Sequence, residues 1–302
     1  MRLGVDLGGT KIEAILMDQN GNIVDRKRVA TPRGDYEKTV LAICDLVDDI
    51  SRQAPGSLPV GIGIPGTVSP ATRLIKNANS TWLIGKPFDK DLEAALKRPV
   101  HLANDADCFA LSEAVDGAGA GQASVFGVIL GTGVGGGIVI DGKPVSGPNA
   151  IAGEWGHNAL PWPESTEIPG PKCYCGKTGC IETWLSGPSL EQQATSDSLS
   201  GLSASEIAKA SRSGQEEAQA LIERYADRLA RALAGVINIL DPNVIVLGGG
   251  LSEIDQLYTL VPEKWGAHVF SDTVVTELKP NAHGASSGVR GAAWLWPDTK
   301  VS

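Results

Sequence analysis

Two glycine-rich turns are the segments of this sequence whose spacing points most directly to chemistry. Residues 129–142 read ILGTGVGGGIVIDG, and the glycines at positions 131, 133 and 136 fit the G-x-G-x-x-G pattern of dinucleotide-binding proteins. That pattern needs a helix directly after the glycines and an acidic residue about 20 positions later. Here the β-branched run IVI leads into the tight turn Asp141-Gly142, so a second strand follows. A Walker loop is excluded too, because no Gly-Lys-Ser/Thr is present.

What remains is a turn between two antiparallel strands, where glycine lets backbone N–H groups converge on an anion. A glycine hairpin chosen only for close packing is the alternative, and for an isolated loop it is the better one. This loop has a counterpart, however, in DLGGTK at residues 6–11. Asp6 is able to hold Mg²⁺ through water and Lys11 to lie near phosphates. The pair predicts two phosphate-binding turns.

A second chemical signal is a cluster of cysteines. Three of the five cysteines crowd into residues 173–180, and an odd count in a reducing compartment favours metal over a disulfide. Glycines at 176 and 179 permit a tight turn between ligands. Four protein ligands in a closed tetrahedral shell are typical of structural zinc, which would hold the loop 157–182 in place. The predicted ligands are His157, Cys173, Cys175 and Cys180.

Composition limits the classes of protein to consider. At 302 residues the chain suits two domains, since one core stops growing near about 250 to 300 residues. Thirty-five acidic against 26 basic residues give a net charge of −9, which disfavours nucleic acid. The start MRLGVDLGGT lacks the apolar stretch of a secretory signal, and no apolar run approaches the roughly 18 residues of a membrane span. We expect a cytoplasmic protein with no membrane partner.

The elements that must position these turns follow from hydrophobic periodicity. Apolar runs at 2–7 and 12–17 flank the first turn, and Asn20-Gly21 is a strong hairpin signal. Residues 59–65 and 99–105 are expected to be strands. A helix is predicted from apolar residues at helical spacing, namely Leu41, Cys44, Leu46, Val47 and Ile50. Strands alternating with helices indicate an α/β fold.

A second round of the same pattern begins with the strand 124–130 and continues through the glycine loop to the turn Asp141-Gly142. The echo predicts two similar lobes that each point a Gly-Thr turn at a shared cleft. Residues 216–240 form a long amphipathic helical pattern, and 243–250 a buried strand that ends in three glycines. The polar stretch 194–206 is expected to be a surface connection.

These motifs together resemble the ROK family of sugar kinases, within the actin/hexokinase-type (ribonuclease H-like) ATPase fold. The matching segments occur in family order over nearly the whole chain: DLGGTK, GIPG at 63–66, LANDAD at 102–107, ILGTGVGGG, AGEWGH at 152–157 and CYCGKTGCIE at 173–182. The likeness is closest to bacterial fructokinases of the manno(fructo)kinase type, through KNANSTWL at 76–83, GEWGHNALPW at 153–162 and SGVRGAAWLWP at 287–297.

The resemblance implies a small lobe of residues 1–117, rejoined by a C-terminal helix at about 287–302, and a larger lobe of residues 118–286. It implies a homodimer that uses ATP and Mg²⁺ to phosphorylate a free hexose to the hexose 6-phosphate. The expected substrate is D-fructose first, and mannose also. Glucokinase and N-acetylhexosamine kinase are alternatives within the family. A non-catalytic sugar sensor or repressor is an alternative from another class; this chain starts at the first strand, where family repressors carry a helix-turn-helix before it.

Asp105 is the candidate catalytic base. Phosphoryl transfer needs a carboxylate to orient the attacking hydroxyl and accept its proton, and Asp105 follows the apolar strand VHLA. The family's Asn-Asp pair matches Asn104-Asp105. The alternative is that Asp105 merely caps the helix that begins near Ala106.

Other roles rest on the resemblance. Because a hexose presents several hydroxyls, a ring of polar groups is needed; the implied set is Gly66, Asn79, Asn104, Glu154, His157 and Glu182. His157 is placed first on zinc. The residues implied to bind ATP are Asp6, Gly8, Gly9, Thr10, Lys11, Gly131, Thr132, Gly133, Val134, Gly135, Gly136, Gly137 and Gly249. For Gly249, a turn needed for close helix-to-strand packing is nearly as good an explanation.

Overall fold

The chain folds into two compact units in the computed structural model, which describes residues 1–296. Unit 1 comprises residues 1–121, residues 137–152 and the C-terminal segment from Ala285 onward. Unit 2 comprises residues 122–136 and 153–284. The last six positions of the predicted C-terminal segment 287–302 lie outside the described residues.

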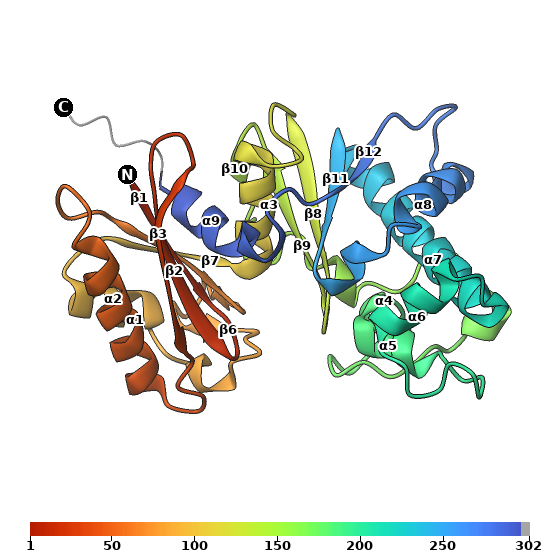
Figure 1. Ribbon diagram of the computed structural model, residues 1–302, viewed down its shortest axis with the longest axis horizontal. Coiled ribbons are helices and arrows are strands. Elements are labelled where there is room, and N and C mark those ends of the chain that lie inside the picture. Colours follow the sequence, from red (N-terminus) through yellow and green to blue (C-terminus); the bar gives the residue numbers. More distant parts are fainter. Residues whose placement is uncertain (297–302) are drawn as a thin grey trace. The chain divides into compact units, whose positions relative to one another are not determined.

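Unit 1 is built on a five-stranded sheet in the order β3-β2-β1-β4-β7 (Figure 1). The strands are β1 (Arg2–Leu7), β2 (Lys11–Met17), β3 (Ile23–Ala30), β4 (Val60–Ile64) and β7 (Val100–Asn104). The first three form the predicted antiparallel meander, while β1, β4 and β7 run parallel. The β2–β3 turn forms because the Asp18 carboxylate accepts the N–H groups of Asn20 and Asn22, and Gly21 takes a φ of 81°.

Helices cover both faces of this sheet. Helices α1 (Tyr36–Ser51) and α2 (Phe88–Leu96) lie on one face, and α9 (Ser287–Trp294) packs on the other beside α3 (Asp105–Asp116) (Figure 1). In α1 the core side is formed by Ile43, Leu46, Val47 and Ile50. The prediction was wrong at Leu41, which is exposed, because Ile43 rather than Leu41 completes the stripe. Small pieces β5 (Thr67–Val68), β6 (Ile75–Lys76) and η1 (Thr81–Leu83) follow β4.

Helix α9 approaches the sheet closely because glycines leave room for it. A Cβ at Gly61 would lie 1.8 Å from the carbonyl oxygen of Ala292, and one at Gly4 would lie 2.4 Å from that of Val289. On its other side, a Cβ at Gly291 would lie 1.6 Å from the carbonyl oxygen of Cys108 in α3. At these three contacts backbone packs on backbone, so the contacts require glycine.

The second sheet has the order β10-β9-β8-β11-β12. Its strands are β8 (Ser124–Leu130), β9 (Val134–Ile140), β10 (Lys143–Pro144), β11 (Val244–Gly248) and β12 (Glu277–Pro280). The chain passes from unit 2 to unit 1 within β9. Strand β11 is buried throughout and runs parallel to β8 and β12, as expected for its continuous apolar run.

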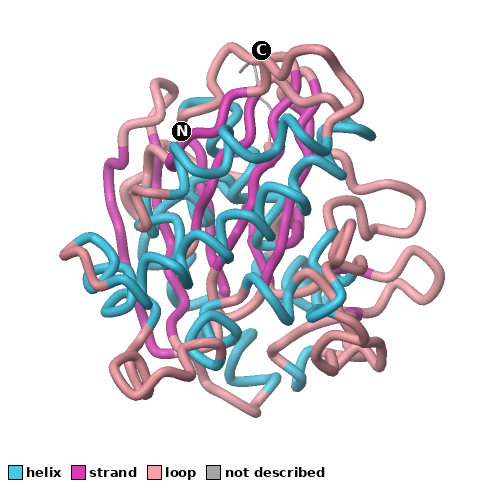
Figure 2. The backbone as a smooth tube through the Cα atoms, turned by 90° about the vertical axis from the view of Figure 1, so that its right-hand side faces the viewer, coloured by secondary structure: helices cyan, strands magenta, loops and turns pink. Residues whose placement is uncertain are grey.

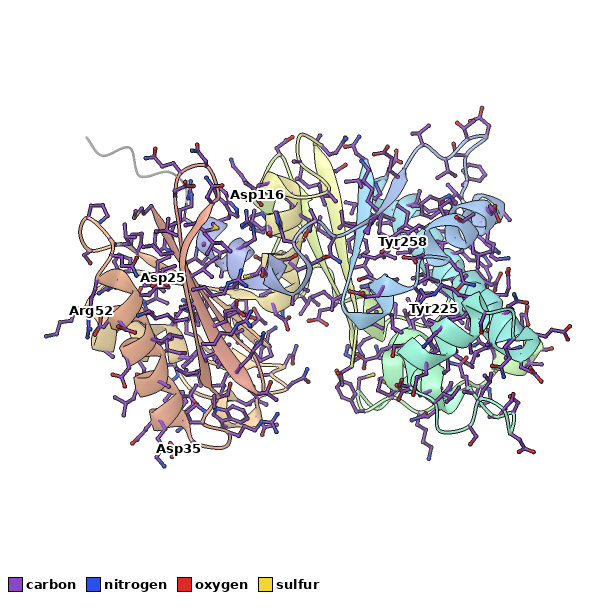
Figure 3. The ribbon with its side chains drawn as sticks, in the orientation of Figure 1. Asp25, Asp35, Arg52, Asp116, Tyr225 and Tyr258 are labelled. Carbon is purple, nitrogen blue, oxygen red and sulfur yellow. The ribbon has the colours of Figure 1, made fainter. Side chains whose placement is uncertain are left out.

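The helices of unit 2 are α4 (Glu182–Leu185), α5 (Gly187–Gln192), α6 (Ala204–Arg212), α7 (Glu216–Leu240) and α8 (Leu257–Trp265), with α7 at the predicted residues (Figures 1 and 2). Tyr225 of α7 is fully buried, and its hydroxyl donates to the Leu185 carbonyl (Figure 3). The connection predicted to run through residue 206 ends sooner, because a capping box between Ser203 and Glu206 starts α6. Within residues 1–296, no helix combines the length and apolar character needed to cross a bilayer.

Candidate active site and metal centre

The first glycine turn, residues 8–11, is held from behind by the chain that follows β3. Its carbonyls are engaged, since Gly8 O accepts the Thr31 hydroxyl at 2.7 Å and Thr10 O accepts the Thr31 N–H at 3.0 Å. Gly9 faces open space, with nothing within 4 Å of where its Cβ would be. A turn with its carbonyls bonded behind it is suited to present N–H groups to an anion.

Asp6 lies near the C-terminal end of β1, and Asp105 directly follows the C-terminal end of β7; these two parallel strands of unit 1 flank β4, so both residues lie at the same edge of the sheet. Burial is the main cause that raises the pKa of Asp6 from 3.8 to about 7, and the Asp105 charge adds to it. A Cβ added at Gly63 would lie 3.6 Å from the Asp6 carboxylate and one at Gly288 would lie 3.7 Å from it, so both glycines pack close to this carboxylate. Two carboxylates that repel each other form a site that a cation would stabilise.

Asn104 and Gly66, both predicted to contact sugar, lie together in unit 1. Asn104 is the N-cap of α3, where its Oδ1 accepts the Ala106 N–H at 2.9 Å and its Nδ2 donates to Gly66 O at 3.3 Å. Asp105 Oδ1 accepts the same N–H at 2.9 Å. Capping is therefore shared, and it fixes Asp105 in the first turn of the helix. Asn79 is exposed between β6 and η1 in the same unit.

The second glycine turn, residues 131–133, is braced by Glu182 from α4. The Val134 N–H donates to Glu182 Oε2 at 2.9 Å, and a Cβ at Gly133 would lie 2.6 Å from that oxygen. The Gly187 N–H donates to Gly131 O at 2.8 Å. A side chain at Gly133 would therefore have to displace the Glu182 carboxylate from the Val134 N–H. Glu182, predicted from resemblance as a sugar ligand, also supports the predicted nucleotide turn.

The remaining glycines of this loop have packing contacts. A Cβ at Gly136 would lie 2.9 Å from both Phe126 and Trp155, and one at Gly137 would lie 2.4 Å from the Ala106 carbonyl. Gly249 has a φ of 80° and would bring a Cβ to 2.4 Å from the Leu130 carbonyl. At the turn itself the Gly131 N–H donates to Gly133 O at 3.0 Å and the Val134 N–H to Glu182, so an anion-binding role for residues 131–133 stays a prediction that rests on Thr132 and Gly133. The assignment of Gly249 to ATP stays a prediction.

Four predicted zinc ligands converge in unit 2. The side-chain ligand atoms of His157, Cys173, Cys175 and Cys180 all lie within 4.8 Å of one another. Cys175 Sγ and Cys180 Sγ are 3.6 Å apart, and Cys173 Sγ lies 3.6 Å from His157 Nδ1. Tetrahedral zinc with Zn–S bonds of about 2.3 Å requires sulfur atoms about 3.8 Å apart. The donor set and its spacing therefore fit this ion.

The two nitrogens of His157 face different partners. Nδ1 faces the sulfurs, while Nε2 lies 3.0 Å from the Tyr174 hydroxyl. A sugar contact by His157 would have to displace Tyr174. Glu154 itself is exposed, just before the 3₁₀ turn Trp155–His157.

A buried ion-pair network that the sequence analysis missed anchors the segment between His157 and the cysteines. Glu167 is 5% exposed, and its carboxylate binds Arg231 at 2.9 Å and Arg228 at 2.6 Å, both from α7. Burial acts to raise the pKa of Glu167, but these hydrogen bonds outweigh it and hold the pKa at about 2. Arg231 also donates to the Trp162 carbonyl. No local spacing signals a pair 64 residues apart.

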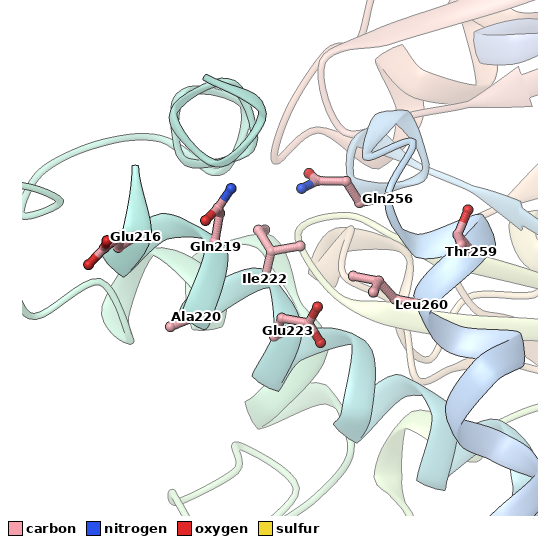
Figure 4. A pocket seen from close by; sticks show the side chains of 8 residues that line it. All are labelled: Glu216, Gln219, Ala220, Ile222, Glu223, Gln256, Thr259 and Leu260. Carbon is pink, nitrogen blue, oxygen red and sulfur yellow. The ribbon is translucent and has the colours of Figure 1, made fainter. Parts of the chain in front are cut away.

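A hollow of about 660 Å³ lies between α7 and the start of α8 in unit 2 (Figure 4). Acidic and amide side chains such as Glu216, Glu223, Gln219 and Gln256 line it around Ile222. None of the residues predicted from the sequence to bind sugar, nucleotide or metal is among its lining residues.

This chain is similar to known proteins over nearly its whole length. The sequence model of the ROK family matches residues 2–299. An N-acetyl-D-glucosamine kinase of Pectobacterium carotovorum subsp. carotovorum (strain PC1) is 40% identical over 299 residues, which covers 98% of each chain. The structure of the ROK hexokinase from Thermus thermophilus has a TM-score of 0.84 at 31% identity, covering 97% of this chain and 96% of that one. A ROK-family glucokinase from Streptomyces griseus, in complex with glucose and AMPPNP, has a TM-score of 0.76 at 29% identity and covers 97% of each chain.

The fold is therefore that of the actin/hexokinase-type ATPases. The chain belongs to the ROK family, and the comparisons group it with the family's sugar kinases.

Proposed function

We propose that this protein is an ATP- and Mg²⁺-dependent N-acetyl-D-glucosamine kinase that forms the 6-phosphate. The observation that carries the proposal is the placement of Asp105 and Asp6 at one edge of a sheet, next to a glycine turn suited to phosphates. The substrate comes from relatives that are 40% identical over 299 residues. The motifs that predicted fructose cover short segments only, so the full-length likeness outweighs them.

Asp105 would act as the general base. The capping contacts fix its carboxylate at the start of α3, where it can orient a sugar hydroxyl and accept its proton. When bound, Mg²⁺ held by Asp6 through water would neutralise charge on the phosphates of ATP. The two glycine turns would supply N–H groups to these phosphates, with Lys11 beside the first turn.

The proposed sugar contacts within unit 1 are Asn79, Asn104 and the Gly66 backbone, and those within unit 2 are Glu154 and Glu182. The Glu182 carboxylate has two oxygens, of which Oε2 accepts the Val134 N–H. Its other oxygen would accept a sugar hydroxyl. Structural zinc on His157 and the three cysteines would fix the segment that carries Glu182.

A coupled assay of ADP release tests the substrate, with N-acetyl-D-glucosamine, glucose, mannose and fructose compared by kcat/KM. We expect N-acetyl-D-glucosamine to give the highest value. A higher value for fructose would restore the prediction made from the short motifs. Turnover of none of the four sugars would refute the kinase proposal.

Asp105→Asn tests the base. We expect kcat to fall by about 10²- to 10⁴-fold with sugar binding retained, because the variant keeps its size and loses the proton acceptor. Asp45→Asn, on the exposed side of α1, makes the same chemical change away from the site and should leave kcat unchanged. Equal kcat in the Asp105 variant and the parent protein would exclude Asp105 as the base.

A further inference from the structure

One buried carboxylate in unit 1 binds three basic side chains. Glu13 of β2 is 1% exposed. It contacts Lys11 Nζ at 3.3 Å, Arg28 Nε at 2.9 Å and Arg26 Nε at 3.4 Å. We call these four residues the Glu13 cluster. No motif in the sequence points to Glu13, Arg26 or Arg28.

The sheet register places this cluster directly behind the first glycine turn. Glu13 is paired with Asp6 on β1 and with Arg28 on β3, so the three side chains form a row on one face of the sheet. Lys11, two residues before Glu13, lies on the same face and at the end of the turn. Arg26 is two residues farther from the turn than Arg28.

The charges of the cluster do not balance. The cluster holds three cations and one carboxylate, and Asp6, paired with Glu13 on β1, adds a second acidic group, so at least one positive charge is in excess. The carboxylate is buried beneath the cations, whereas the Lys11 and Arg28 side chains are 46% and 47% exposed. Both of these cations bind Glu13 Oε2, and Arg28 also donates through Nη2 to Glu13 Oε1 at 3.0 Å. A pair of exposed cations held side by side by a buried anion is arranged to bind an external anion.

We propose that Arg28 is a second cationic ligand, beside Lys11, for the terminal phosphates of the nucleotide, and that Glu13 is the positioning residue that holds both. This inference rests on the proposed function, because it takes the nucleotide to bind at the first glycine turn. Arg28 suits the role, since Nε and Nη2 bind Glu13 while the guanidinium has further N–H donors on Nη1 and Nη2 that can reach phosphate oxygens. Glu13 acts only through the two cations and touches no ligand.

Arg26 provides a matched control. It binds the same carboxylate and carries the same charge, but it lies one register step farther along β3 and donates to the Ser286 hydroxyl. Arg26→Met therefore removes one partner of Glu13 without removing the cation next to Lys11. Arg28 makes two contacts with Glu13 and Arg26 makes one, so a purely structural role would lower Tm in both variants without a selective loss of AMPPNP affinity in Arg28→Met.

The experiment measures KM for MgATP and for sugar, and calorimetric Kd for Mg²⁺-AMPPNP and for adenosine. We expect Arg28→Met to raise KM for MgATP and Kd for AMPPNP about tenfold, the size of one charge-assisted contact. The KM for sugar and the Kd for adenosine should stay constant, and Arg28→Lys should restore part of the loss. Arg26→Met should change these constants less than about threefold.

Glu13→Gln keeps the size of the side chain and removes the charge that holds both cations, so its effect on KM for MgATP should match or exceed that of Arg28→Met. If Glu13→Gln does not fold, the two arginine variants decide alone. Equal AMPPNP affinity in the parent protein and Arg28→Met, or equal losses in the two arginine variants, would overturn the inference. Because AMPPNP binding needs no sugar, a chain that phosphorylates none of the sugars would still test the role of Arg28.

Discussion

The Asp6 carboxylate is expected to lower the free energy of unfolding of this protein. Its carboxylate lies against Gly63 and Gly288 and near the charge of Asp105, and burial with this repulsion raises its pKa from 3.8 to about 7. We predict that Asp6→Asn abolishes kinase activity and stabilises the protein at pH 8. A neutral amide of the same size removes the repulsion and much of the desolvation cost.

The magnitude follows from linkage. An acid whose folded pKa is raised holds its proton more tightly in the folded state than in the unfolded state. The fold is therefore most stable with respect to Asp6 below about pH 4, and stability falls as pH rises from about 4 to about 7. A shift of about three units at about 1.36 kcal/mol each gives an upper bound of about 4 kcal/mol. Because the side chain is only partly buried, we expect about 2 kcal/mol.

Urea unfolding of the parent protein and Asp6→Asn at pH 4.5, 6 and 8 measures this effect. The stability difference between the two should grow with pH and level off above about pH 7. Asp18→Asn is a control of opposite sign, because hydrogen bonds from Asn22 lower the pKa of Asp18. Its carboxylate stabilises the fold above the unfolded pKa and loses that effect in acid. An Asp6→Asn protein that is less stable than the parent at pH 8 would refute the reasoning.

Three further predictions concern the metal centre, Glu182 and the packing of α9. Metal analysis should find about one zinc per chain, and Cys175→Ser should lower both the zinc content and Tm; active protein that is folded without metal would contradict the site. Glu182→Ala should raise KM for MgATP as well as for sugar, because it leaves the Val134 N–H without its acceptor. A rise in the KM for sugar alone would show that Glu182 does not support the second glycine turn. Gly61→Ala should lower the free energy of unfolding by about 1 to 3 kcal/mol or more, since its Cβ would meet the backbone of α9, while Gly266→Ala, in open space, should have little effect in the same urea titration.

Local patterns predicted the elements well because each depends on neighbouring residues. The β2–β3 hairpin follows from Asn20-Gly21, and α7 from a repeat that holds from 216 to 240. Leu41 shows the limit of this approach, because periodicity cannot choose between two adjacent apolar stripes until the sheet beneath is present. The α6 start was readable from Ser203 and Glu206, three residues apart.

Residues of the candidate site could be predicted from the sequence where they lie within one short segment. The four metal ligands lie within 24 positions and do converge. The Glu13 cluster depends instead on strand register, and the Glu167 network joins a loop to a distant helix. Both are made of charged residues that, singly, are normal on a surface. Their burial and pairing emerge only from the tertiary structure.

The contacts of α9 have a consequence for synthesis on the ribosome. The helix that covers one face of the first sheet, at Gly4 and Gly61, is the last described element to leave the exit tunnel. Until all of unit 2 has been translated, that face of the nascent sheet has only α3 on it, and the surface that α9 covers on β1, β2 and β4 is open to chaperones or to other unfinished chains. A chain truncated after Gly284 should therefore accumulate in the insoluble fraction even though its second unit is complete.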